Sequence, residues 1–276
     1  MASAKTIVSS VELSGAGLHS GQVVRLRLNP EREGRGIRFV RTDLPGEPAI
    51  GSRDVDRHCL PFRTALKKGN AEVHTVEHIL SALAGLGITQ CLIEIDGAEI
   101  PGMDGSALNF LEALRRAGIE TLPNQTSEPI VVRERMFIQD GPASIEAVPH
   151  DGLKVTYTLD YPGHTLAKGT FEFEFSEAAF ASDIAGARTF AILPEAERMI
   201  SAGFGKGATA QNTVIVDGAN AVGTQLRFAN EPVRHKILDL IGDLYVLGRP
   251  LHAHVTARLS GHRTNRMLAL ALMDTL

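Results

Sequence analysis

The sequence of 276 residues contains no tryptophan, only two cysteines and no long cluster of lysine and arginine. Cys59 and Cys91 are too few for a disulfide framework and suit a reducing compartment. The formal net charge of −4 argues against a nucleic-acid partner, since a phosphate-binding surface normally carries a basic excess. There is also no apolar stretch of membrane-spanning length and no signal-peptide core. We therefore expect a cytoplasmic protein with no nucleic-acid partner and no stable membrane insertion.

What the sequence does contain is typical of a globular protein. Hydrophobic residues make up 43% of the chain and charged residues 22%, and the length favours two domains. The best linker candidate is residues 123–129, which hold two prolines and several polar residues. This predicts an N-terminal α+β domain at residues 1–123 and a C-terminal α+β domain at residues 130–276.

In the first half, alternating apolar residues predict strands, and apolar residues three or four apart predict helices. Strands are expected at residues 23–28, 37–40 and 91–96, and helices at 73–83 and 106–117. Ser106 is placed to cap the second helix and Gly118 to end it. Three glycines at positions 15, 17 and 21 predict a tight loop, in which His19 either points into a site or caps a turn.

The second half repeats this plan. Strands are expected at residues 130–132, 143–148, 153–159, 170–175, 213–216 and 251–259, and helices near Ala178 and Pro194, at 233–244 and from about His262. In each half, a helix that carries a histidine precedes a short strand and a second helix, and residues 78–83 resemble residues 235–240. We infer a duplicated α+β fold of two two-layer α/β sandwich domains, with the active site between their helical layers.

The helix at residues 233–244 organises this prediction. His235, Asp239 and Asp243 follow one another at four-residue spacing and so share one face, while apolar residues cover the rest of the helix surface. Such a helix is expected to be buried, with its polar face toward an enclosed site. A buried carboxylate needs a partner, and a metal ion is one; a core histidine bonded to an aspartate is the plainer alternative.

The first half offers two ways to complete a metal site. His74 to His78 match the His-x-x-Glu-His pattern of the inverted zinc-peptidase motif, in which both histidines bind metal. A site of His78, His235 and Asp239 instead uses both halves of the duplication and leaves the fourth zinc position open for water, and we prefer it. Glu77 could then take a proton from that water; otherwise it is a carboxylate favoured by the helix dipole.

A further histidine stands at the predicted start of the last helix. His262 follows Gly261, where backbone N–H groups are free to face an anion. A carboxylate such as Asp243 nearby would keep its imidazole protonated, although a simple capping histidine is equally compatible with the local sequence.

The region at residues 191–204 is apolar enough to hold an acyl chain. Ile192, Met199, Ile200 and Phe204 would form this passage, or they are ordinary core residues. The glycines at positions 203–207 lack the Gly-Lys-Ser/Thr of a phosphate loop, which argues against nucleoside triphosphate binding.

Together these motifs resemble one family over essentially the whole chain, the zinc-dependent UDP-3-O-acyl-N-acetylglucosamine deacetylases of lipid A biosynthesis. The resemblance includes Gly-Leu-His-Ser-Gly at 17–21, Thr-Val-Glu-His at 75–78, Ala-Arg-Thr-Phe at 187–190, Val-Arg-His-Lys at 233–236 with Asp239 and Asp243, and Ser-Gly-His at 260–262 with Asn265. Several separated motifs in the same order are far more specific than any one of them.

The resemblance implies a function and a role for each site residue. It implies zinc bound by His78, His235 and Asp239, with Glu77 as the general base, His262 as the second catalytic group, Asp243 orienting His262, Thr189 bonded to the oxyanion, and Phe190 and Lys236 in contact with substrate. We add His19, Ile192 and Phe204 to the substrate-binding residues. The substrate would be a UDP-linked acylated amino sugar, which is hydrolysed at its acetamide. We expect the protein to be a monomer. The alternative hypothesis is a non-catalytic protein that binds a glycolipid or a nucleotide.

Overall fold

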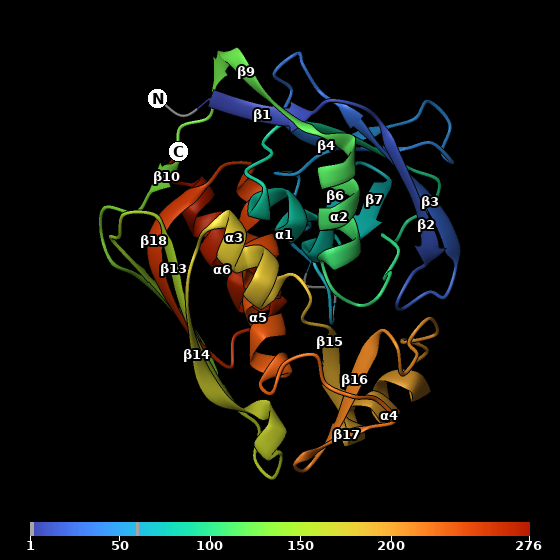
Figure 1. Ribbon diagram of the computed structural model, residues 1–276, viewed down its shortest axis with the longest axis vertical. Helices are drawn as coiled ribbons and strands as arrows, with labels where there is room; N and C mark the ends of the chain where they lie inside the picture. Colours follow the sequence, from blue (N-terminus) through green and yellow to red (C-terminus); the bar gives the residue numbers. More distant parts are fainter. Residues whose placement is uncertain (1–2, 59–60) are drawn as a thin grey trace.

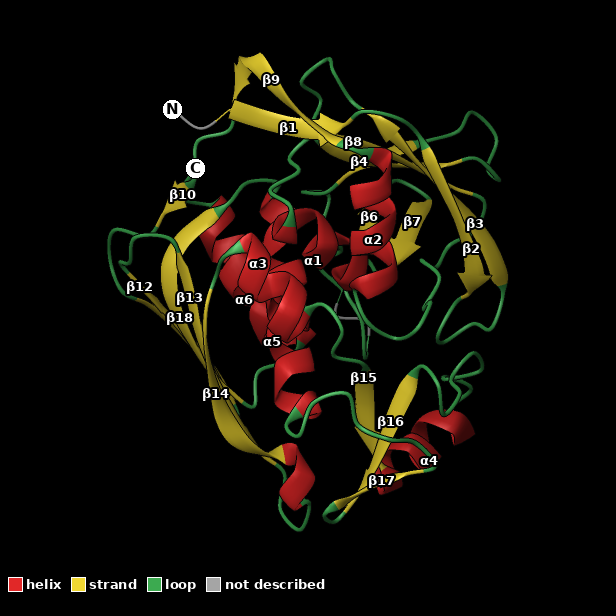
Figure 2. Ribbon diagram, in the orientation of Figure 1, coloured by secondary structure: helices red, strands yellow, loops and turns green. Residues whose placement is uncertain are grey.

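The computed structural model describes residues 3–58 and 61–276, so Cys59 lies outside the described part of the chain. Helices gather in the middle of the molecule, and a β-sheet from each half of the chain lies outside them (Figures 1 and 2). A smaller group of strands with one helix projects below them in the same view. No helix of the described residues is long and apolar enough to span a membrane.

The first half builds a five-stranded sheet in the order β2-β3-β8-β4-β5. Its strands are β2 (Val11–Ala16), β3 (Val23–Pro30), β4 (Ile37–Arg41), β5 (Ala49–Gly51) and β8 (Cys91–Ile95). A separate pair joins β1 (Ser3–Ile7) to β9 (Ile119–Thr126), and a hairpin joins β6 (Ala65–Lys68) to β7 (Ala71–His74). The helices are α1 (Glu77–Gly85) and α2 (Leu108–Ala117).

The second half builds its main sheet in the order β11-β12-β18-β13-β14, with β10 paired to β18. Its strands are β10 (Ile130–Val131), β11 (Met136–Asp140), β12 (Ala143–Val148), β13 (Leu153–Asp160), β14 (Lys168–Glu174) and β18 (Leu251–Arg258). The helices packed on it are α5 (Glu231–Leu244) and α6 (His262–Met273), and the short α3 (Glu177–Ala179) follows β14 in the chain.

The two sheets have the same topology. In each, a hairpin leads to a strand that pairs antiparallel with the central strand, which is β8 in the first half and β18 in the second. The central strand then pairs parallel with β4 or β13, and an antiparallel edge strand follows. Each central strand also lies between two helices in the sequence. The predicted duplication of an α+β unit is confirmed.

The two helical layers meet where α1 packs against α5. Gly242 makes this close packing possible, because a Cβ atom added there would lie 1.9 Å from the carbonyl oxygen of Glu77. Any larger residue would therefore push the two helices apart. This contact sets Glu77 and His78, at the start of α1, beside the polar face of α5.

The second half carries an insertion that the sequence analysis did not separate from its domain. It is a three-stranded sheet, with one helix beside it, made of β15 (Thr189–Ile192), α4 (Leu193–Ser201), β16 (Thr213–Asp217) and β17 (Asn220–Val222). The strand at 213–216 and the helix near Pro194 were predicted correctly. They lie outside the main sheet, at the lower right of Figure 1.

Three predicted segments in the first half were wrong in extent. The helix expected from residue 73 begins only at Glu77, because residues 71–74 form β7 and Thr75 adopts a φ of 60°. Gly15, expected in a loop, lies within β2. Pro123 to Thr126, expected as linker, belong to β9, which leaves only residues 127–129 between strands. The domain boundary itself stays a prediction.

Candidate active site

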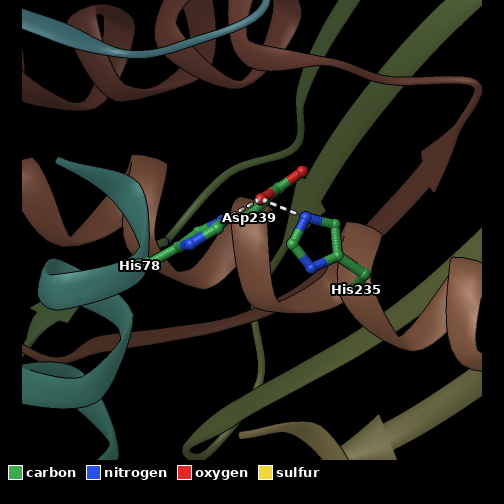
Figure 3. A group of neighbouring side chains, drawn as sticks. All are labelled: His78, His235 and Asp239. Carbon is green, nitrogen blue, oxygen red and sulfur yellow. Dashed lines mark ion pairs between the residues drawn. The ribbon is translucent and has the colours of Figure 1, made fainter. Parts of the chain in front are cut away.

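Two histidines and an aspartate converge where α1 meets α5. Nε2 of His78 lies 3.6 Å from Oδ1 of Asp239, and Nε2 of His235 lies 3.2 Å from the same oxygen. The three side chains are buried, and one ligand atom from each lies within 4.8 Å of the other two. In Figure 3, His78 comes from α1, whereas His235 and Asp239 come from α5. This is the geometry of a possible metal site, with two nitrogen donors and one oxygen donor.

Charges around Asp239 favour its carboxylate form. Burial alone would raise the pKa of Asp239, but His235 and Lys236 outweigh it and hold the pKa well below its usual range. Nζ of Lys236 donates to Oδ2 of Asp239, whereas both imidazoles face Oδ1. Burial also lowers the pKa of His78, which favours the neutral ring that a metal ligand requires. The electrostatics therefore suit a cation.

His235 is oriented by the segment before β15. Its Nδ1 lies 3.0 Å from the carbonyl oxygen of Ala187, so Nδ1–H donates to that oxygen and Nε2 is the nitrogen that faces Asp239. Metal-binding histidines are commonly fixed in this way by a second partner. The same segment continues into Thr189, the first residue of β15.

A second polar cluster adjoins the first. Nδ1 of His262 lies 2.9 Å from Oδ2 of Asp243, and its Nε2 lies 3.9 Å from Oε1 of Glu77. Burial lowers the pKa of His262, but the carboxylates of Asp243 and Glu77 more than compensate and raise it to about 9. Burial raises the pKa of Glu77 to about 8. The charge of His262 opposes this shift, and the charges of Asp243 and Asp239 add to it. At neutral pH His262 is therefore an imidazolium.

Both clusters open into one cavity of about 360 Å³. Residues from the two halves and from the insertion line it together. Among the residues predicted from sequence, the lining includes His19, Glu77, His78, Thr189, Phe190, His235, Lys236, Asp239 and His262. Asp243 lies behind His262 and is 1% exposed. The structure thus brings the predicted metal ligands and the predicted catalytic and polar substrate-binding residues together at one cavity.

The predicted acyl-passage residues are placed differently from one another. Met199 lines the cavity, whereas Ile192 packs beside Val214 and Val216 in the small core of the insertion. Ile200 is 67% exposed. Phe204 contacts the ring of His19, with ring centroids 5.8 Å apart, and lines a neighbouring cavity. For Ile192, ordinary core packing is the better description.

His19 and His74 have different surroundings. The backbone N–H of His19 donates to Oε1 of Glu99, and burial lowers the pKa of the His19 ring to about 4, so the ring is neutral. It faces the cavity rather than capping a turn. His74 lies at the end of β7, with Nε2 3.3 Å from Glu72. Within the described residues, His74 is not part of the group around Asp239, so the inverted peptidase motif gains no support.

Two polar contacts at the site were missed from sequence. Thr64 donates from Oγ1 to Oδ1 of Asp243 over 2.6 Å, and Arg188 forms a buried ion pair with Glu231 in the first turn of α5. Both join residues far apart in the chain, and no local pattern marks them. The only available signal was Glu231 near the start of the predicted helix at residues 233–244, and acidic residues are common at helix starts whether or not they form ion pairs.

A buried His–His–Asp group beside a second carboxylate and an imidazolium, all facing one cavity, has the parts that metal-dependent hydrolases use. A sequence model of the UDP-3-O-acyl N-acetylglycosamine deacetylase family matches residues 4–274. The chain belongs to this family.

Curated relatives agree with that membership. A UDP-3-O-acyl-N-acetylglucosamine deacetylase of Leptospira biflexa is 38% identical, over 98% of this chain and 89% of the relative. The protein of that name from Thermosynechococcus vestitus is also 38% identical, over 97% and 93% of the two chains. The one from Bdellovibrio bacteriovorus is 37% identical, over 98% and 90%.

Proposed function

We propose that this chain is a zinc-dependent N-deacetylase that hydrolyses the acetamide of a UDP-linked 3-O-acyl-N-acetylglucosamine and releases acetate, a step of lipid A biosynthesis. The observation that carries the proposal is the convergence of His78 from one half of the chain with His235 and Asp239 from the other, beside Glu77. Family membership supplies the substrate class. We further propose that the chain acts as a monomer, without a nucleic-acid partner.

His78, His235 and Asp239 would hold the metal ion. Two imidazole nitrogens and one carboxylate oxygen are a common ligand set for catalytic zinc, and three protein ligands leave a coordination position for water or substrate. When bound, such an ion polarises the substrate carbonyl, lowers the pKa of water to about 7 and favours ionised carboxylates nearby. Lys236 occupies Oδ2 of Asp239 and so leaves Oδ1 for the cation.

Glu77 would be the general base. Its carboxyl group is buried at the cavity wall, and burial raises its pKa to about 8; the charge of His262, whose Nε2 lies 3.9 Å from Oε1, and a bound metal ion would both favour the ionised form. In this form Glu77 can accept the proton of the attacking water. The His262 ring is itself held in orientation by Asp243, which accepts a hydrogen bond from Nδ1 of His262.

His262 would be the general acid. Its Nε2–H points to the side of the cavity where Glu77 lies, so it can hydrogen-bond to the developing oxyanion and then transfer its proton to the departing amine, which leaves His262 neutral. Thr189 lines the same cavity and can supply a hydroxyl donor to the oxyanion. Each such donor is worth on the order of 3 kcal/mol of barrier.

The function is tested by acetate release from the UDP-linked acylated N-acetylglucosamine, with and without a zinc chelator. We expect Glu77→Gln to reduce kcat roughly 100- to 10,000-fold, because a positioned base contributes about that much, while bound zinc is retained. Glu94→Gln, at a glutamate outside the cavity, is the matched control and should keep full activity. No acetate release by the unmodified protein, or full activity of Glu77→Gln, would contradict the proposal.

The metal ligands are tested by elemental analysis of purified variants. Asp239→Ala should lose bound zinc, because it removes the oxygen that both imidazoles face. His74→Ala should retain zinc, because His74 lies apart from this group. The reverse pattern would favour a site built on the inverted peptidase motif instead.

A further inference from the structure

Thr64 contacts both Glu77 and Asp243, the carboxylate that orients His262. It lies immediately before β6 and is 4% exposed. Its Oγ1–H donates to Oδ1 of Asp243 over 2.6 Å, and its backbone N–H donates to Oε2 of Glu77 over 3.1 Å. Its carbonyl oxygen accepts from the backbone N–H of Thr75, just before α1. One residue of the first half therefore contacts Glu77 at the cavity wall and Asp243 behind it.

The hydroxyl of Thr64 helps to fix the plane of the Asp243 carboxylate. Nδ2 of Asn265 donates to Oδ2 of Asp243 over 2.8 Å, on the other oxygen from Thr64. Nδ1 of His262 lies 2.9 Å from Oδ2 and 3.2 Å from Oδ1. With one donor held on each oxygen, the carboxylate cannot rotate without breaking a buried hydrogen bond, which costs about 1–3 kcal/mol. The His262 ring is thereby held in a single direction.

The backbone of Thr64 distinguishes the two oxygens of Glu77. Oε2 accepts the Thr64 N–H, whereas Oε1 is the oxygen that lies 3.9 Å from Nε2 of His262. A carboxylate oxygen that already accepts a backbone hydrogen bond is the weaker proton acceptor of the pair. Oε1 is therefore the oxygen left to accept a proton.

We propose that Thr64 is a positioning residue for this reaction: its hydroxyl holds Asp243 against His262, beside the backbone contact that Thr64 makes with Glu77. The inference rests on the proposed deacetylase function. Thr64 is not a catalytic residue, since it acts through Glu77 and Asp243. It makes the two halves of the chain depend on each other for proton transfer, because Asp243 and His262 come from the second half.

The test is Thr64→Val, which keeps the shape and the backbone N–H but removes the hydroxyl donor. We expect kcat for acetate release to fall roughly 10- to 100-fold, the usual size of a supporting-contact effect, while KM stays within about twofold and zinc content is unchanged. A loss in kcat at constant KM identifies an interaction that matters in the transition state rather than in substrate binding. Thr64→Ser restores a hydroxyl and should recover most of kcat.

The matched control is Thr6→Val. Thr6 is fully buried, and its Oγ1 accepts from the backbone N–H of Glu31 over 3.0 Å, away from the cavity. The same substitution there removes a buried hydrogen bond too, so it should lower the unfolding midpoint and leave kcat unchanged. Comparing the two variants separates positioning from stability.

The inference is overturned if Thr64→Val keeps wild-type kcat, or if Thr64→Ser is as slow as Thr64→Val. If Thr64→Val does not fold, Thr64→Ala against Thr64→Ser gives the same comparison without any risk of overpacking. The proposed function fails separately, since it requires the unmodified chain to release acetate. A readout independent of turnover is the imidazole NMR signal of His262, which should broaden or double in Thr64→Val because the ring is no longer held in one orientation.

Discussion

Arg188 and Glu231 form a buried ion pair. Glu231 is fully buried and accepts from Nε of Arg188 over 2.9 Å and from the backbone N–H groups of Arg188 and Arg227. Burial alone would raise the pKa of Glu231, but these donors outweigh it and lower the pKa below its ordinary value near 4.5. The pair ties the residue before Thr189 to the first turn of α5.

This depressed pKa predicts how stability changes with pH. As the pH falls, the unfolded chain takes up a proton at Glu231 before the folded chain does. The contribution of Glu231 is thus fully present above about pH 4.5 and is lost as the pH falls through the lower, folded-state pKa. Urea unfolding should show Glu231→Gln to be less stable by about 3 kcal/mol at pH 6, with a flatter decline below pH 4.5.

Glu174→Gln, at an exposed position of β14, is the control and should follow the wild-type curve. Parallel curves for wild type and Glu231→Gln below pH 4.5 would show that the pair contributes no such pH dependence.

At the scale of elements, sequence periodicity predicted α5 well. Its polar face and apolar surroundings both follow from 3.6-residue spacing, and the helix spans Glu231–Leu244 against an expected 233–244. Where tertiary contacts override local preference, the prediction failed. Thr75, between β7 and α1, adopts a left-handed φ of 60°, and the spacing of apolar residues does not predict this break. Pro123 is found in β9, paired with β1.

The contact of α1 with α5 depends on the absence of a side chain at Gly242. A Cβ there would lie 1.9 Å from a backbone oxygen of Glu77, so the helices must separate to accommodate it. We expect Gly242→Ala to lower the free energy of unfolding by about 1–3 kcal/mol, the usual cost of overpacking, and to reduce kcat because Glu77 and His78 shift relative to α5. Chemical denaturation and acetate release measure the two effects.

Gly51→Ala is the matched control for that substitution. Gly51 lies in β5, and an added Cβ would meet its nearest neighbour, a side-chain oxygen of Asp54, at an ordinary contact distance of 3.5 Å. This variant should retain activity and nearly all stability. If Gly242→Ala behaves in the same way, the close approach of the helices does not limit the site.

At the scale of the whole molecule, one apolar core runs through both halves. Buried residues of the first sheet and of the second belong to a single cluster, joined through α1 and α5. Since neither helical layer is covered without the other, we expect one cooperative unfolding transition. Calorimetry should give a van't Hoff enthalpy equal to the calorimetric enthalpy. Two resolved transitions would show that the halves unfold independently.

The convergence of the site could be predicted because the duplication places matching helices in both halves. The contacts that support it could not be predicted, since Thr64 and Asp243 are 179 positions apart and Arg188 and Glu231 are 43 apart. Such pairs depend on the packing of whole elements. Sequence therefore identifies the residues that carry chemistry more readily than those that hold them in place.

The duplication also bears on the asymmetry of the proposed metal site, to which both repeats contribute a histidine but only the second contributes an aspartate. When residues 78–83 are aligned with residues 235–240, His78 matches His235, which lies 157 positions later, and Ala82 stands where the second copy has Asp239. Two identical subunits meeting across a twofold axis could supply only matched pairs of groups. Joining both copies in one polypeptide lets each evolve on its own, so that a single acid stands beside two imidazoles.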